Sequence, residues 1–417
     1  MTSADRNPGD VRMRGFTGRA LVETARAWVD AHSAVLGSET IELGEAQGRI
    51  LSEDLLATFD VPQFDRAAMD GYALRGSETD GAGDYNPLSL SIIGEALPGQ
   101  PYEGDVPPGS AVRIMTGAPV PRGTDAVLPA EFARELTGKV EALAAVPPGK
   151  NVGRRSEDVR AGETVLSSGR KLRPQDLGVL ASLGIAKVSV CRRPRVRIVI
   201  TGDELVPPGQ PIGPYQIYEA NSAMLRSLVA RDGGTLESCR RVRDQREEIR
   251  AAIIAAGADV ILVSGGSSVG AEDHAPSIVA GEGTLAIHGI AMRPSSPAGM
   301  GKIGSSLVFL LPGNPVSCLC AYDFFAGRAI RRLGGRRVEW PYPQITLSAG
   351  RKIVSAVGRL DYCRVRIVDG LVEPLALSGA SILSSTTRAD GFVVIPEECE
   401  GYAPGTPVVV YRYDQGE

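Results

Sequence analysis

The chain is poor in the residues that build metal clusters and disulfide frameworks. Its six cysteines are scattered without any Cys-x-x-Cys spacing, and its only three histidines stand at positions 32, 274 and 288. Such isolated cysteines predict reduced thiols in a cytoplasmic protein, because small secreted domains pair their cysteines in dense frameworks. Three histidines so far apart in the chain argue against a zinc site built on histidine.

Long apolar runs and an excess of positive charge are also missing. No run approaches the roughly 20 apolar residues of a membrane-spanning helix, and residues 1–16 lack the apolar stretch of a secretion signal. The net charge is −4. We therefore expect neither a membrane nor a nucleic-acid partner, since nucleic-acid binding depends on clustered positive charge.

Glycine and proline, by contrast, are abundant, with 50 and 29 residues. Their excess predicts many tight turns and a large β component. A chain of 417 residues exceeds what one hydrophobic core organises, so several domains are expected. Residues 58–150 and 338–417 both consist of short apolar runs between glycines and prolines, which is typical of β domains.

Between these β-rich regions the pattern alternates between strands and helices. Strands are predicted at 195–201, 236–242, 260–263, 285–292 and 307–314, and helices at 221–234, 244–258 and 314–335. This alternation favours a parallel sheet with helices on both faces. Further helices are predicted at 17–32 behind a Thr17 cap, at 44–51 and at 174–184.

Three polar loops follow three of these strands: residues 201–204 (TGDE), 264–270 (SGGSSVG) and 311–315 (LPGNP). Ligands of open α/β sheets bind at the carboxyl ends of the strands, so we expect the loops to meet there. Asn314 suits a helix N-cap and Pro315 the first helical position, so the following helix should aim backbone N–H groups at this crevice. Such donors fit a phosphate.

Acidic residues in the same loops change that prediction. Glu204, Glu272 and Asp273 would repel a phosphate unless a cation such as Mg²⁺ bridges carboxylate and phosphate oxygens. Each loop alone is equally typical of an ordinary turn, but the three together favour a magnesium–phosphate site. A Rossmann site fits less well, since GGSSVG at 265–270 is not Gly-x-Gly-x-x-Gly, and a P-loop lacks its Gly-Lys-Ser/Thr.

Taken in order, the motifs of this chain resemble one family, the molybdopterin molybdenumtransferases (MoeA and the gephyrin E domain). They are GRIL at 48–51, PQFDRAAMDGYA at 62–73, RIMTGAPVP at 113–121, SED at 156–158, TGDEL at 201–205, SGGSSVG at 264–270, LPGNPVS at 311–317, GRLDY at 358–362 and ILSS at 382–385. The resemblance covers essentially the whole chain, and an ordered series is far more specific than any single motif.

The resemblance implies a multidomain α/β plus β architecture. It assigns residues 1–57 and 151–190 to an elongated N-terminal or linker domain, 58–150 to a β-rich lid, 191–337 to a MogA-like doubly wound α/β domain that binds molybdopterin, and 338–417 to a C-terminal β-barrel. It also implies a homodimer in which the partner's lid completes the cleft. The implied reaction inserts molybdate into adenylylated molybdopterin and releases AMP with Mg²⁺. The molybdopterin adenylyltransferase is a further candidate partner.

The same resemblance carries functional roles onto individual residues. The implied catalytic residues are Asp70, Thr116, Glu204 and Asp273, with Glu204 and Asp273 also as Mg²⁺ ligands. The implied substrate-binding residues are Asp158, Ser264, Gly265, Gly266, Arg293, Ser296, Gly313, Asn314, Pro315 and Arg364.

Four positions depart from the family pattern, and they include positions that hold molybdate in the family. Two lysines of the family appear as Arg293 and Ser296, a serine appears as Ala380, and the arginine of an Asn-Val-Arg segment appears as Gly153. We therefore expect weak use of molybdate, with Arg293 compensating in part through its bidentate guanidinium. Two alternatives stay open: a catalytically weak paralogue that binds molybdopterin or acts as a scaffold, and a transferase for another oxyanion such as tungstate.

Overall fold

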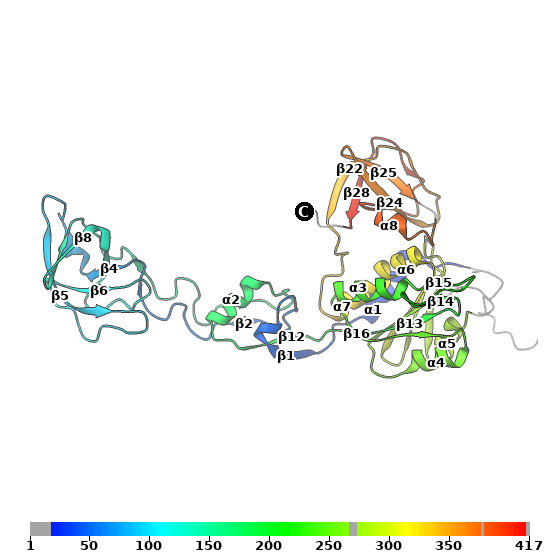
Figure 1. The fold of residues 1–417 in the computed structure, drawn as a ribbon, viewed down its shortest axis with the longest axis horizontal. Coiled ribbons are helices and arrows are strands. Elements are labelled where there is room, and N and C mark those ends of the chain that lie inside the picture. The colour runs from blue at the N-terminus through cyan, green and yellow to red at the C-terminus, as the bar shows by residue number, and fades with distance from the viewer. Residues whose placement is uncertain (1–17, 267–272, 377–378, 414–417) are drawn as a thin grey trace, which may run out of the picture. The chain divides into compact units, whose positions relative to one another are not determined.

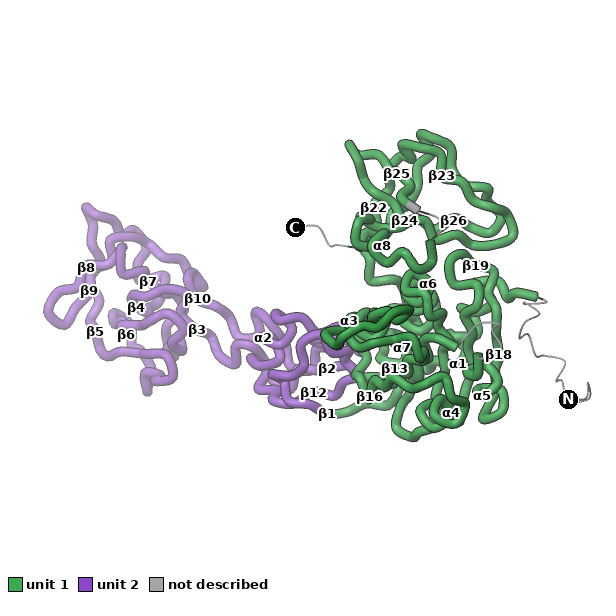
Figure 2. Tube along the Cα trace, turned by 45° about the vertical axis from the view of Figure 1, so that its right-hand side comes forward, with its two compact units in different colours: residues 1–39, 191–417 green, residues 40–190 purple. Residues whose placement is uncertain are grey.

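The computed structural model describes residues 18–266, 273–376 and 379–413 and divides the chain into two compact units (Figure 2). One unit contains residues 40–190, and the other combines residues 1–39 with 191–417. All six cysteines are free thiols, which confirms that the chain has no disulfide framework. Within the described ranges, none of the helices has the length and apolar character needed to cross a membrane.

The unit of residues 40–190 is built on a six-stranded sheet with the order β7-β4-β6-β5-β9-β8. The strands are β4 (Gly71–Leu74), β5 (Leu88–Ala96), β6 (Ser110–Ile114), β7 (Ala126–Pro129), β8 (Ala133–Leu136) and β9 (Lys139–Ala142). Every residue of β4 is buried because alternate side chains pack into two different cores, Tyr72 and Leu74 into one and Ala73 into the other. The β character predicted for residues 58–150 is confirmed.

The rest of this unit pairs short strands around helix α2. The elements are β2 (Leu55–Leu56), β3 (Arg66–Ala67), β10 (Val152–Gly153), β11 (Thr164–Leu166) and α2 (Pro174–Ser182), and β1 (Ser38–Glu42) pairs with β12 (Lys187–Cys191) where the two units join in sequence. The predicted helix at 174–184 is confirmed, but the one at 44–51 is wrong. A short 3-10 turn ends at Glu45, Gly48 takes a left-handed φ of 73°, and Leu51 then forms a β-bridge with Val190.

The larger unit contains an α/β sheet with the order β16-β13-β17-β21-β20-β18 (Figure 1). Its strands are β13 (Arg195–Thr201), β16 (Thr235–Val242), β17 (Val260–Ser264), β18 (Thr284–His288), β20 (Gly299–Ile303) and β21 (Ser306–Leu311). The first four strands are parallel, but β20 runs antiparallel to both of its neighbours, β21 and β18. The prediction of an all-parallel sheet is therefore wrong, because a tight turn at 304–305 folds the glycine-rich β20 back onto β21.

Helices cover both faces of this sheet, as predicted. They are α1 (Val22–His32), α3 (Asn221–Arg231), α4 (Arg246–Ile254), α5 (Ala275–Glu282), α6 (Pro315–Ala321) and α7 (Gly327–Leu333). On β13, Ile198 packs with α1, α3, α6 and α7 in one core, and its neighbour Val199 packs with α4 and α5 in the other. The predicted long helix is continuous but contains a π-helical turn at Tyr322–Ala326 between α6 and α7.

Helix α1 begins later than predicted. Its first residue is Val22, and Leu21 at the N-cap position has no side-chain oxygen to accept a capping hydrogen bond. Thr17, the predicted cap, lies outside the described residues. The helix is held by tertiary packing instead, since Val22, Ala25 and Val29 are almost completely buried in the larger core of the α/β sheet.

The C-terminal part of this unit has its own mixed sheet with the order β19-β24-β26-β28-β22, and β25 pairs with β24. The elements are β19 (Met292–Arg293), β22 (Gln344–Ser348), β23 (Ile353–Val354), β24 (Leu360–Val368), β25 (Leu371–Ala376), α8 (Ser384–Thr387), β26 (Gly391–Ile395), β27 (Gly401–Tyr402) and β28 (Pro407–Arg412). The single strand predicted at 285–292 is wrong. Gly289, at φ 89°, breaks it, and β19 leaves the α/β sheet to pair with β24.

Candidate active site

The three polar loops meet at the carboxyl edge of the α/β sheet, as the sequence predicted. Residues 200–202, 204–205, 264–266 and 312–315 line one cavity of about 620 Å³. They follow β13, β17 and β21, which are neighbours in the sheet, so the topology brings their ends together. Residues 267–272, including Glu272, lie outside the described residues.

Glycine is required where the second loop crosses the first. Gly265 has a φ of 96°, and a side chain there would place its Cβ 2.4 Å from the carbonyl oxygen of Thr201. Gly265 therefore permits both the left-handed backbone and the close approach of the two strand ends. A residue with a side chain could not adopt this backbone conformation so close to Thr201.

Four carboxylates line this cavity: Glu204, Glu219, Asp244 and Asp273. None of the described residues that line it is lysine or arginine. Burial raises the pKa of Asp244, and the nearby carboxylates of Asp203 and Glu204 act in the same direction. The cavity is therefore strongly anionic, which favours a bound cation.

The donors suit a cation that shares its coordination with a ligand. Among the described residues, no group of three or more His, Cys, Asp or Glu side chains could close around a metal ion. Mg²⁺, however, commonly takes only one or two carboxylates and completes its shell with phosphate oxygens and water. Asn221 adds a neutral oxygen, since its Oδ1 is buried without a hydrogen-bond partner while its Nδ2 donates to Ser264 Oγ at 2.9 Å and to the Gly313 carbonyl at 2.8 Å. The residues present thus fit a magnesium ion bound with a phosphate.

Two of the predicted phosphate donors are not available. The Gly265 N–H donates to the Leu311 carbonyl at 3.2 Å, and the Val316 N–H donates to the Ala380 carbonyl at 3.0 Å. Pro315 has no N–H at all. Asn314 occupies the N-cap position of α6 as predicted but makes no side-chain cap hydrogen bond. The prediction that this helix start aims free N–H groups at the crevice is therefore wrong for its first two residues.

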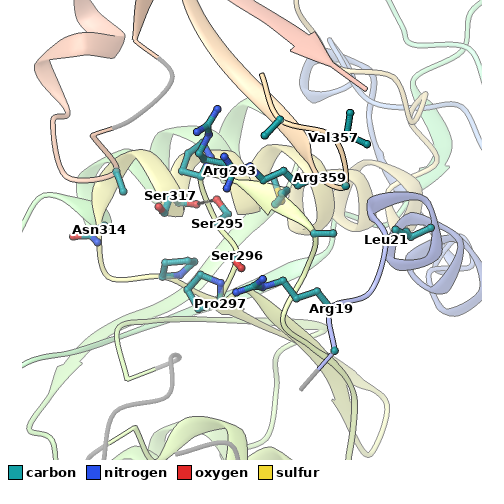
Figure 3. A pocket seen from close by; sticks show the side chains of 18 of the residues that line it. Arg19, Leu21, Arg293, Ser295, Ser296, Pro297, Asn314, Ser317, Val357 and Arg359 are labelled. Atoms are coloured by element: carbon teal, nitrogen blue, oxygen red, sulfur yellow. Dashed lines mark hydrogen bonds between the residues drawn. The ribbon is translucent and has the colours of Figure 1, made fainter. Parts of the chain in front are cut away.

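A second cavity, of about 860 Å³, adjoins the first (Figure 3). The two share Pro297, Pro312 and Asn314 in their linings. The lining comes mainly from four segments of the chain, at 18–21, 291–297, 356–359 and 379–380. Its described residues include Arg19, Arg293 and Arg359 and no aspartate or glutamate. This cavity therefore has the opposite charge from its neighbour.

Two of these arginines share one buried carboxylate behind the cavity wall. The pairing of β19 with β24 sets Arg293 opposite Asp361, which is fully buried. Asp361 accepts hydrogen bonds from Nε and Nη2 of Arg293, the first at 3.0 Å, and from Ser355 Oγ at 2.6 Å. Arg359 Nε lies 3.4 Å from the same carboxylate. One negative charge thus orients two guanidinium groups.

The loop that follows Arg293 has an unusual backbone. Ser295 is buried at φ 86°, and its hydroxyl donates to the Ser317 carbonyl at 2.6 Å. A non-glycine residue in this left-handed conformation costs free energy and recurs at functional sites. Next to it, Ser296 lines the cavity with a buried Oγ that has no hydrogen-bond partner.

Ala380 lines the arginine-rich cavity together with Arg293 and Ser296, so three residues implied by the resemblance for oxyanion binding meet here. Arg364 does not join them. Its side chain is fully buried in the C-terminal sheet and lines neither cavity. Ser264 is also buried, and its hydroxyl accepts the Asn221 hydrogen bond instead of facing open space.

The remaining predicted residues belong to the unit of residues 40–190. Thr116 donates to Asp70 Oδ1 twice, from its hydroxyl at 2.6 Å and from its backbone N–H at 2.7 Å. These two hydrogen bonds hold the pKa of Asp70 below its ordinary value, and the one from the Thr116 hydroxyl has the larger effect. Thr116 also lines a cavity of about 430 Å³ with Arg66 and Glu157. Asp158 is exposed beside it, with its backbone N–H bonded to Val61.

Sequence reasoning missed five charged or amide side chains that line the two main cavities: Arg19, Glu219, Asn221, Asp244 and Arg359. Asp244 had a detectable signal, because it follows the predicted strand at 236–242 and therefore lies at the same carboxyl edge. Arg19 had none, since only the tertiary structure brings it to the cavity.

Comparisons with known proteins agree over most of the chain. Residues 20–184 match the MoeA N-terminal region (domain I and II), residues 197–332 a molybdopterin-binding domain, and residues 346–413 the MoeA C-terminal region (domain IV). The chain is 34% identical over 385 residues to the molybdopterin molybdenumtransferase of Haemophilus influenzae, covering 90% of this chain and 94% of that protein.

A second relative and a solved structure extend this similarity. The chain is 35% identical over 384 residues to molybdopterin molybdenumtransferase 2 of Mycobacterium tuberculosis, covering 89% of this chain and 94% of that protein. The crystal structure of a molybdopterin biosynthesis MoeA protein from Pyrococcus horikosii superposes with a TM-score of 0.83 at 32% identity, covering 96% of this chain and all of that one.

Proposed function

The chain belongs to the MoeA family of molybdopterin molybdenumtransferases, transferases of molybdenum cofactor biosynthesis, and we propose that it inserts molybdate into adenylylated molybdopterin and releases AMP with Mg²⁺. The observation that carries this proposal is the pair of adjoining cavities, one lined by four carboxylates and the other by three arginines. The reaction brings together a phosphoanhydride, which needs a cation, and an oxyanion, which needs fixed positive charge.

The carboxylate-lined cavity is proposed to hold the phosphoanhydride end of the substrate. Glu204 and Asp273 would supply the protein ligands of Mg²⁺, and Asn221 Oδ1 would orient a donor of the ligand or a bound water. The cation supplies charge neutralisation on the phosphate oxygens. Asp244, whose pKa is raised by burial, would be a stronger base toward an attacking water than an ordinary aspartate.

The arginine-lined cavity is proposed to hold molybdate. Arg293 has its planar guanidinium fixed by Asp361, so little conformational freedom is lost when its remaining donors contact an oxyanion. The unpartnered Ser296 Oγ offers a further donor on the same wall. A ligand that spans both cavities would carry its dithiolene toward the molybdate and its phosphates toward the carboxylates.

The decisive experiment incubates the purified protein with adenylylated molybdopterin, Mg²⁺ and molybdate and measures both cofactor formation and AMP release. We expect both products to rise together, and omission of Mg²⁺ to abolish AMP release. A parallel reaction with tungstate tests the alternative oxyanion. If neither product exceeds a control without protein, with either oxyanion, the enzymatic proposal fails and a molybdopterin-binding or scaffold role takes its place.

We further propose that the active form is a homodimer in which Asp70 and Thr116 of one subunit complete the cleft of the other. The Asp70–Thr116 hydrogen bonds fix an ionised carboxylate in a part of the chain that lies outside the unit containing both main cavities. Co-expressed Asp70→Asn and Asp273→Asn chains, each inactive alone, should recover part of the activity, because a mixed dimer has one intact composite site. Mixed dimers without any recovery, or a fully active monomer by light scattering, would contradict this arrangement.

A further inference from the structure

The segment before α1 reaches the arginine-lined cavity through backbone pairing. The Ala20 N–H donates to the Gly289 carbonyl at 3.0 Å, and the Ala291 N–H donates to the Ala20 carbonyl at 2.8 Å. These bonds form a parallel bridge between Ala20 and Ile290, at the start of the segment that leads into β19. After Leu21 the chain enters α1, whose buried face anchors it to the core. The Arg19 backbone is thereby fixed at the rim of the cavity.

Arg19 approaches the cavity from a different side than the other two arginines. Figure 3 shows its side chain extending from the segment before α1 toward the loop with Ser296 and Pro297. Arg293 and Arg359 lie on the wall formed by β19 and β24 and share the single carboxylate of Asp361. That wall therefore has more positive than negative charge, and Arg19 adds a guanidinium facing it.

We infer that Arg19 is a specificity-determining residue that contacts the oxyanion directly and sets the affinity for molybdate; this inference rests on the proposed function. A tetrahedral dianion exposes oxygens in all directions, so tight binding requires charged donors on more than one side. The short side chain of Ser296 leaves its side of the cavity without a cation of its own. The long, forked side chain of Arg19 supplies that cation from a neighbouring segment.

The inference predicts a selective effect on the oxyanion. In Arg19→Gln, the molybdate concentration that gives half-maximal cofactor formation should rise about tenfold, the low end for a hydrogen bond to a charged group, because Arg19 is exposed to solvent. Arg19→Lys should show a smaller rise because it keeps the charge and loses the fork. The half-saturating concentration of adenylylated molybdopterin should not change in either variant.

Arg351→Gln is the matched control. Arg351 is an exposed arginine of the same unit that pairs with Glu373 at 3.2 Å and lines neither cavity. Arg351→Gln removes the same charge from the protein as Arg19→Gln does. An equal effect in both variants would therefore mean that net charge, not contact, controls molybdate use. Thermal unfolding of all variants checks that the fold is kept.

A binding measurement separates this inference from the proposed function. Molybdate titrated calorimetrically into wild type and variants reports affinity whether or not cofactor forms. Weaker binding in Arg19→Gln and unchanged binding in Arg351→Gln support the inference even if the wild type forms no cofactor, in which case only the proposed function fails. Equal molybdate affinity in wild type and Arg19→Gln overturns the inference, even when the wild type is active.

Discussion

The two adjoining cavities of the larger unit are opposite in charge and different in origin. The carboxylate-lined cavity is formed mainly by loops that follow neighbouring parallel strands, so the order of the sheet alone brings its residues together. The arginine-lined cavity draws on both sheets, on the segment before α1 and on the loop at 379–380. The first is a product of one topological rule, and the second depends on how the whole unit packs.

The cavities also differ in how they manage their charge. The described residues that line the first cavity include four carboxylates and no lysine or arginine, and burial, together with the charges of Asp203 and Glu204, raises the pKa of Asp244 there. In the second cavity, buried Asp361 already pairs with two of the arginines. Under the proposed function, the first cavity needs an added cation, whereas the arginines of the second are already oriented for an anion.

The largest expected effect comes from breaking the carboxylate-lined cavity. Asp273→Asn should lower AMP release by about 100-fold or more, because a neutral amide is a poor Mg²⁺ ligand and stabilises charge in the transition state less well. Thermal unfolding should stay close to wild type, since a carboxylate in a strand-end loop contributes little to the core. Near-normal turnover in this variant would remove Asp273 from the mechanism.

The next effect comes from adding charge to the other cavity. Ser296→Lys should lower the half-saturating molybdate concentration by about tenfold, the low end for a charged hydrogen bond. Pterin affinity should change little, because the substituted side chain faces the arginine-lined cavity. The measurement is cofactor formation against molybdate concentration. An unchanged or higher value would mean that the site is built around other ligands than those we assign.

Ala380→Ser sharpens the same comparison with a neutral donor. Ala380 already fixes the start of α6 through its carbonyl, and its side chain lines the cavity beside Ser296 and Arg293. A serine hydroxyl there should contribute about 1 kcal/mol, which is about fivefold in molybdate affinity. Combined with Ser296→Lys, it should lower the half-saturating concentration further. If the double variant behaves like Ser296→Lys alone, residue 380 does not contact the oxyanion.

The smallest expected effect concerns stability and pH. Because the folded protein raises the pKa of Asp244 above its ordinary 3.8, the ionised carboxylate destabilises the fold at neutral pH. Asp244→Asn should therefore slightly raise the unfolding temperature at pH 7. This gain should shrink as the pH falls through the raised pKa and vanish below about pH 3.8, where the carboxyl is protonated in both states.

Added Mg²⁺ tests whether Asp244 destabilises the fold through its charge. It should stabilise the wild type more than Asp244→Asn, because the cation offsets repulsion that the variant no longer has. Calorimetric scans with Mg²⁺ and with a chelator provide this comparison. Equal stabilisation of both proteins would show that the carboxylates do not share a cation.

Much of the carboxylate-lined cavity could be predicted from the sequence. The apolar runs before TGDE, SGGSSVG and LPGNP predict strands, and the connection rule for parallel strands then places Glu204, Asp273 and Asn314 at one edge. The helices on both faces follow from the same alternation. These features are local or depend on one general rule, so a linear pattern contains them.

The tertiary structure alone decided the rest, because it depends on contacts between distant segments. Backbone hydrogen bonds occupy the N–H groups of Gly265 and Val316, so these groups are not available to a phosphate. No sequence pattern in those loops indicates these hydrogen bonds. β19 pairs with β24 of the C-terminal sheet, and this pairing sets Arg293 opposite Asp361. The pairing of Ala20 with Ile290 brings Arg19 to the arginine-lined cavity. Composition and spacing determined which residues could bind a cation or an anion. Long-range backbone pairing decided which of them share a cavity, since such pairing is stabilised by the packed core as a whole and not by the residues beside it.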